Sequence, residues 1–131
     1  MFKDKKLIIA SNAEVTKAIR DGLLFYQHEI VFTCDIEIRA KIKARKITAL
    51  GNLNVLCEDI ECDNITCAKT LSARCINAGQ AIEARYVLAK AINCDRIEAL
   101  AVKSDFLGCR SHDVTTLQVV DVHVLTSVKK I

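Results

Sequence analysis

The stretch that decides the fold spans residues 76–104 and reads INAGQAIEARYVLAKAINCDRIEALAVKS. Within it an aliphatic residue recurs every five or six positions, and a small residue follows it two places later. The pairs are Ile76/Ala78, Ile82/Ala84, Val87/Ala89, Ile92/Cys94, Ile97/Ala99 and Val102/Ser104. Side chains two residues apart share one face of an extended segment, so each pair predicts a short strand with one buried face.

Upstream, six further pairs keep the same spacing. They are Ile42/Ala44, Ile47/Ala49, Leu53/Val55, Ile60/Cys62, Ile65/Cys67 and Leu71/Ala73. An amphipathic helix would place apolar residues at i, i+3, i+4 and i+7, and this region does not hold that spacing. Short strands joined by bends are therefore predicted throughout residues 42–104.

Grouped in threes, the pairs form coils that start at Ile42, Ile60, Ile76 and Ile92, spaced 18, 16 and 16 residues apart. Stacking places isoleucine on isoleucine along two walls and leucine or valine along the third. A fainter earlier coil consists of Leu24, Ile30/Phe32 and Ile36/Ile38. We predict an all-β fold, a three-sided parallel β-helix of about five coils over residues 24–104. The mixed steps lack a strict hexapeptide period, so a right-handed helix is expected.

A solenoid needs caps at its ends, because a terminal coil lacks a neighbour. Residues 1–23 are predicted to form a strand and a capping helix that begins at Ser11 or Asn12 and ends near Asp21, before Gly22. Its predicted buried stripe is Ala13, Val15, Ala18 and Ile19. Residues 105–131 are predicted to be an irregular β cap or oligomerisation strands. The whole chain, 1–131, is expected to be one domain.

Composition narrows the class of protein. The 131 residues are 51% hydrophobic but only 5% aromatic, and the net charge is +3. No stretch approaches the length of a membrane span, and no signal peptide is recognisable. Seven cysteines without a secretory signal predict reduced thiols and a cytoplasmic protein.

The segment Ile42–Ala49 (IKARKITA), echoed at Ile82–Arg85 (IEAR) and Ile97–Ala99 (IEA), resembles the repeats of bactofilin-type polymer-forming solenoids. It is equally similar to short β-helical proteins carried by bacterial phages, and the resemblance covers residues 36–104. Bactofilin repeats are richer in glycine and their ends are uncapped, whereas this chain has four glycines, no proline and predicted caps. The phage-type resemblance implies a role in virion structure or in neutralising a host defence.

Cysteine and histidine are the candidate metal ligands or catalytic groups. Cys62, Cys67 and Cys94 occupy the small slot that alanine fills in other coils, so they are interpreted as core residues. Cys57 and Cys75 fall at predicted corners and should be accessible, and no converging C-x2-4-C pairs indicate zinc. The histidines, His28, His112 and His123, are predicted to lie outside the regular coils, at the surface or in a cap. We therefore predict no metal, no cofactor and no catalytic residue.

A basic run is the clearest charged feature. It comprises Arg39, Lys41, Lys43, Arg45 and Lys46. Strand alternation turns several of these side chains outward, which would suit a phosphate or an acidic partner. The favoured alternative is a solvated face whose charge is offset by the next coil, where Glu61 is predicted to stack near Lys43. No aromatic residues interleave with the run, so nucleic-acid binding is not favoured.

Four large apolar residues are predicted to face outward. They are Leu50, Tyr86, Leu88 and Leu100, and three of them (Leu50, Tyr86 and Leu100) are expected to share one corner column. A column of exposed apolar residues indicates a lateral contact. We therefore expect a homo-oligomer, a dimer rather than a filament, formed through this edge or through the valine-rich C-terminal strands.

These features favour a non-enzymatic structural or interaction protein, a rigid scaffold that self-associates and presents a surface to a protein partner. One alternative is a phage-borne inhibitor of a host defence that acts by binding or sequestration. A second is an acyltransferase-like solenoid enzyme, whose histidine would lie near an intersubunit cleft. No membrane association is expected.

Overall fold

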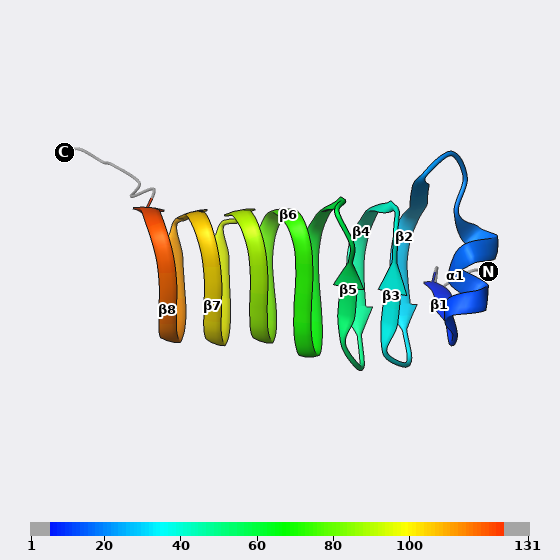
Figure 1. Cartoon of the computed structure of the whole chain (residues 1–131), viewed down its shortest axis with the longest axis horizontal. Helices are drawn as coiled ribbons and strands as arrows, with labels where there is room; N and C mark the ends of the chain where they lie inside the picture. Colours follow the sequence, from blue (N-terminus) through cyan, green and yellow to red (C-terminus); the bar gives the residue numbers. More distant parts are fainter. Residues whose placement is uncertain (1–5, 125–131) are drawn as a thin grey trace.

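The structure, a computed structural model, describes residues 6–124. The elements in chain order are β1 (Lys6–Ile9), α1 (Asn12–Ala18), β2 (Leu23–Phe32), β3 (Ile36–Ile38), β4 (Lys41–Ala49), β5 (Leu53–Val55), β6 (Asp59–Asn93), β7 (Arg96–Cys109) and β8 (Ser111–Val124). The strands wind into a β-solenoid of about six turns, stacked along one axis with α1 and β1 at one end and β8 at the other (Figure 1). The predicted parallel β-helix is confirmed.

Strand pairing between successive turns is parallel and in register. Leu24 pairs with Ile42 and Ile42 with Ile60, while Ile97 pairs with His112 further along. β6 is 35 residues long and wraps onto itself. Side-chain hydrogen bonds between residues 16 positions apart, from Asn64 to Gln80 and from Asn93 to Asn77, join its turns.

Three ladders of large apolar side chains fill the interior, and each defines one wall. The first wall carries Leu24, Ile42, Ile60, Ile76, Ile92, Leu107 and Val122. The second carries Ile30, Ile47, Ile65, Ile82, Ile97 and His112. The third carries Ile36, Leu53, Leu71, Val87, Val102 and Leu117. All members before β8 are at most 2% exposed, so the predicted core ladders are confirmed.

The solenoid extends further than the sequence spacing predicts. Residues 105–124 do not form an irregular cap, because β8 continues the parallel pairing along all of β7, from Arg96–Ser111 to Cys109–Val124. The turn that β8 adds also makes the coil region longer than 24–104. The remainder of the predicted cap, residues 125–131, lies outside the described part of the chain.

α1 closes the N-terminal end, as expected, but it is shorter than predicted. Ser11 is the N-cap: its Oγ accepts a hydrogen bond from Glu14 N, and Glu14 Oε1 accepts one from Ala10 N. The helix ends at Ala18, well before Asp21. Val15 is buried as predicted, but Ala13 is exposed, so its assignment to the buried stripe is wrong.

Two contacts tie the N-terminal segment to the first turn. β1 pairs with the second-wall part of β2, from Lys6–Glu29 to Ile9–Phe32. Asn12 Oδ1 accepts a hydrogen bond from Glu37 N at the edge of β3, 3.0 Å away. β1 and α1 therefore cover the second and third walls at this end. In the described range, α1 is the only α-helix, and its seven residues are too few to cross a membrane.

Candidate interaction surfaces

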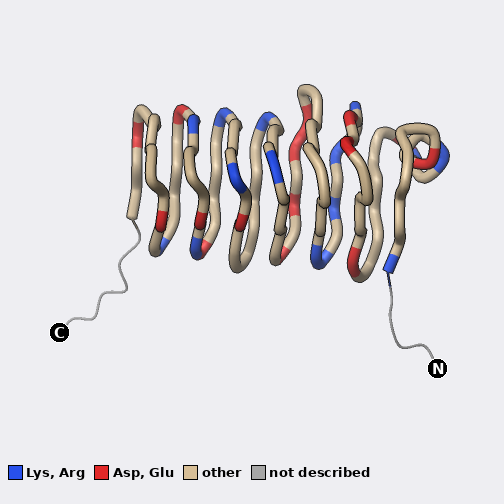
Figure 2. Tube along the Cα trace, turned by 90° about the horizontal axis from the view of Figure 1, so that it is seen from below, with Lys and Arg blue, Asp and Glu red and all other residues tan. Residues whose placement is uncertain are grey.

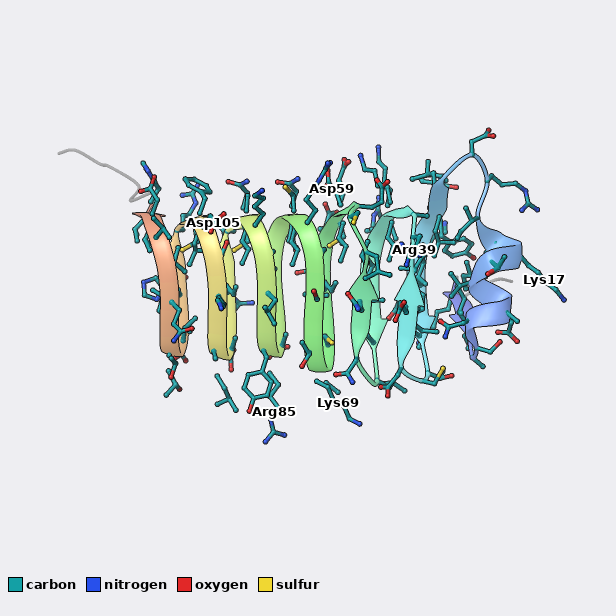
Figure 3. All side chains as sticks on the ribbon, viewed as in Figure 1. Lys17, Arg39, Asp59, Lys69, Arg85 and Asp105 are labelled. Carbon is teal, nitrogen blue, oxygen red and sulfur yellow. The ribbon has the colours of Figure 1, made fainter. Side chains whose placement is uncertain are left out.

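The basic run is spread around the solenoid and partly neutralised. Lys41 Nζ lies 3.2 Å from Glu61 Oε1, and Lys43 Nζ lies 3.7 Å from Glu61 Oε2. Glu61 is one turn away on the first wall. The hydrogen bond from Lys41, assisted by the charge of Lys43, holds the pKa of Glu61 below its ordinary value. Arg39 lies between β3 and β4, where the chain passes from the third wall to the first (Figure 3). Lys46 pairs with Asn64 on the second wall. The predicted stacking of Lys43 on Glu61 is confirmed.

Charges of both signs alternate along the whole solenoid rather than gathering around the basic run (Figure 2). The best-formed ion pair joins Arg74 to Asp59, with Nε–Oδ1 and Nη2–Oδ2 distances of 2.9 and 3.0 Å. This bidentate hydrogen bond lowers the pKa of Asp59 and raises the pKa of Arg74. Arg110, between β7 and β8, pairs with Asp95, between β6 and β7, through a single contact of 2.7 Å from Nε to Oδ1.

Sequence reasoning missed an aromatic residue beside the basic run. Phe25 is the direct strand partner of Lys43, and 55% of its surface is exposed. Together with Tyr26 and Arg45 these residues line an open depression of about 250 Å³. Phe25 and Lys43 are 18 positions apart in sequence, so only the stacking register of the first turn reveals the pairing.

A shallow groove of about 430 Å³ follows the corner between the third and first walls. Its cationic side chains come from three successive turns: Arg74, Lys90 and Lys103. Leu88 and Asp105 also line it, so the groove combines an exposed apolar group with net positive charge. Figure 3 shows Asp105 and Asp59 along the same edge of the solenoid.

The four outward apolar residues do not form one column. Tyr86 pairs with Ala101 rather than lying beside Leu100, so its placement in the column of Leu100 is wrong. Leu88 pairs with Lys103 on the third wall and lines the corner groove. Arg85 lies over the ring of Tyr86, with Cζ 5.9 Å from the ring centroid, and Lys69 projects from the same edge of the solenoid as Arg85 (Figure 3). Self-association through these residues stays a prediction.

Carboxylates stack on the outer face of the second wall, which the sequence analysis did not anticipate. Glu83 pairs with Glu98, and Glu98 pairs with Asp113 on the next turn. Like charges directly opposite each other destabilise a sheet. Arg96 and Lys46 line the same depression as Glu83 and Glu98, so positive charges lie beside these stacked carboxylates.

Within residues 6–124, no group of three or more histidine, cysteine, aspartate or glutamate side chains is arranged to hold a metal ion.

The cysteines divide as the small-slot pattern predicts. Cys62, Cys67 and Cys94 are buried in the slots that alanine fills elsewhere, and Cys57 is exposed. Cys75 is half-buried at its corner. Burial, reinforced by neighbouring carboxylates, raises the pKa of the Cys62 thiol from 9.0 to about 12. Burial likewise raises the pKa of Cys94 to about 12, with a further contribution from Cys109.

These buried thiols should make the fold sensitive to alkali. An unfolded chain releases its thiol protons above about pH 9, whereas the native state retains them to about pH 12, so stability falls as the pH rises through this window. Between pH 8 and pH 10 each thiol should lower the free energy of unfolding by about 1–2 kcal/mol. Urea unfolding at the two pH values measures the loss.

The matched control is the double variant C62A/C94A, which carries the residue present at equivalent slots such as Ala44 and Ala78. It should lose about 3 kcal/mol less than the wild type between pH 8 and pH 10. Other groups that ionise in this range, such as lysine and tyrosine, contribute equally to both proteins. Identical losses in the two proteins would contradict the assignment of the effect to these thiols.

His112 and His123 are exposed, as predicted, but all three histidines lie in strands of the solenoid rather than outside its coils. His28 is in β2, and its ring contacts Tyr26 edge-on with centroids 6.2 Å apart. His112 occupies the isoleucine position of the second wall in the last turn, where it pairs with Ile97. His123 lies 3.2 Å from Asp121 and 5.2 Å from the ring of Phe106, measured between ring centroids. The three histidines therefore lie on different parts of the solenoid.

A scan against protein-family models and searches of curated proteins and of solved structures found no match to this chain. What the geometry establishes is a β-helical repeat architecture, and the likeness to bactofilins and to phage-type proteins is a likeness of core spacing.

Proposed function

We propose that this chain is a non-enzymatic structural protein, a rigid β-helical scaffold that self-associates and presents its outer walls to a protein partner. The observation that carries this proposal is the continuity of the three ladders from β2 to β8. Almost every residue between Leu24 and Val124 belongs to a turn of the solenoid. Each turn packs on its neighbours, so the rod behaves as one stiff unit.

The outer surface suits contact with a macromolecule. Its depressions are open and shallow, with charged and apolar side chains mixed along their length. Sites that enclose small molecules are concave and bury most of the ligand surface. The corner groove beside Leu88, with its three cationic side chains, is the part of the surface we assign to an acidic protein partner.

Light scattering over a hundredfold dilution, with negative-stain images of the same samples, tests the self-association in this proposal. We expect one small oligomer of constant mass, because α1 and β1 occupy the N-terminal end of every copy. Filaments that lengthen with concentration would instead favour a polymer-forming role. A mass of 14.5 kDa at every concentration would contradict self-association altogether.

A further inference from the structure

The C-terminal end of the described solenoid is open. Among residues 6–124, β8 pairs with β7 alone, so its other edge carries unpaired backbone groups over a strand of 14 residues. The inward side chains of this turn are far more accessible than their partners in the preceding turn. Val122 is 38% exposed although its partner Leu107 is fully buried, and Val124 is 46% exposed above the buried Cys109.

Apart from His112 on the second wall, the other inward positions of this end are also apolar. Val114, Leu117 and Val119 are half-buried against the core, in the positions that Ala99, Val102 and Ser104 occupy one turn earlier. A long, exposed and hydrophobic strand edge is a template for pairing with another chain. Such an edge persists in a folded protein when something covers it.

The opposite end of the solenoid cannot serve as the cover. β1 pairs with β2 there, and α1 is fixed to the edge of β3 by the hydrogen bond between Asn12 and Glu37. Head-to-tail stacking would require β8 to displace both elements. The surface that remains available to a second copy is its own open end.

We propose that two copies of this chain pack their C-terminal ends against each other, with the two β8 strands antiparallel across a two-fold axis. The proposal rests on the self-association inferred above and names the surface responsible. A two-fold contact is self-complementary and closes after two copies, which gives a dimer. The dimer would bury the apolar cross-section of both last turns and satisfy the backbone groups of both edges.

The ability of Asp121 to contact His123, seen within one chain at 3.2 Å, selects the alignment on the first wall. If the axis passes through Val122, antiparallel pairing places Asp121 opposite His123 of the partner subunit, and the reverse contact forms at the symmetry-related position. Val122 then packs against its own copy. An axis through Asp113 on the second wall would instead oppose two carboxylates. The geometry therefore points to an axis at Val122.

The first test introduces a lysine at an inward position of β8 and, as the control, at an outward position two residues away. Val122→Lys places a charge in the interface, whereas Val120→Lys changes an outward side chain that is 85% exposed. By light scattering, the wild type and V120K should have twice the chain mass, and V122K should dissociate at least tenfold more readily. A V122K protein that stays as dimeric as V120K overturns the interface but leaves self-association through another surface intact.

The second test includes a compensating double variant, so a loss of the dimer caused by misfolding of the last turn can be recognised. Asp121→Lys should weaken the dimer at least tenfold, because it removes the carboxylate that faces His123 of the partner subunit, and D121K/H123E should restore it by placing an ammonium group opposite a carboxylate. No recovery in the double variant overturns the alignment. A monomeric wild type overturns both this interface and the self-association, and protection of residues 125–131 from proteolysis in that monomer would identify the chain's own C-terminal segment as the cover.

Discussion

Replacing Ile76 with aspartate is expected to abolish the cooperative fold. Ile76 is fully buried in the middle of β6, on the first-wall ladder between Ile60 and Ile92. The change removes about 3 kcal/mol of core packing, and the buried, unpaired carboxylate adds several kcal/mol more. Domains of this size are stable by only about 5–15 kcal/mol, so the variant should be largely unfolded. Far-UV circular dichroism and soluble yield measure the outcome.

The adjacent residue supplies the control. Asn77 is exposed on the outer face, and its Oδ1 accepts a hydrogen bond from Asn93 Nδ2. Asn77→Asp keeps this acceptor, so the free energy of unfolding should change by about 0.5 kcal/mol or less. Equal stability of the two variants would mean that Ile76 and Asn77 do not lie on opposite faces of the strand. The three ladders would then be incorrect.

Replacing Val15 with aspartate is expected to turn a small oligomer into growing assemblies. Val15 is the buried residue of α1, which contacts β1 and β3 at the N-terminal end. A carboxylate in that position costs about 2–4 kcal/mol and should release the helix from the solenoid. The edge of β3 then becomes available while β1 still covers β2, so copies can also associate through the exposed edge of β3. Light scattering should show a mass that rises with protein concentration.

Ala13→Asp is the matched control, because Ala13 lies on the exposed face of the same helix. An aspartate in the first turn also interacts favourably with the helix dipole, so this variant should keep the wild-type mass and stability. Filaments formed by A13D, or a V15D protein with the wild-type mass at every concentration, would show that α1 does not limit assembly.

The ladders could be predicted from sequence because each wall is a local signal. A buried large residue, usually followed two places later by a small one, marks a strand, and this signal recurs in every turn from Ile42 to Ser104. The cysteine assignments followed for the same reason, since Cys62 and Cys94 replace alanine in a repeated slot. The stacking of Lys43 on Glu61 required only the register of these ladders.

The last turn and the corners could not be predicted in the same way. His112 stands where every other turn has isoleucine, and valine fills the small slots at Val119 and Val124, so the repeat is obscured although the backbone continues. Tyr86 lies four residues after Ile82, whereas Leu100 lies three residues after Ile97, so the two differ by one position in the same corner. The pairing of Phe25 with Lys43 follows from the stacking of Leu24 on Ile42, whereas the register shift between Tyr26 and Glu29 cannot be read from the apolar spacing.

The stacking register also bears on how the chain folds during synthesis. The pairings between β2 and β8 join residues 15 to 18 positions apart, for example 18 from Leu24 to Ile42 and 15 from Ile97 to His112. Each turn can therefore be completed as soon as one more turn of polypeptide has left the ribosome. The capped N-terminal end emerges first and offers a single growing edge to the nascent chain. We expect folding to proceed turn by turn towards the C-terminus, with the surface for the second copy completed last.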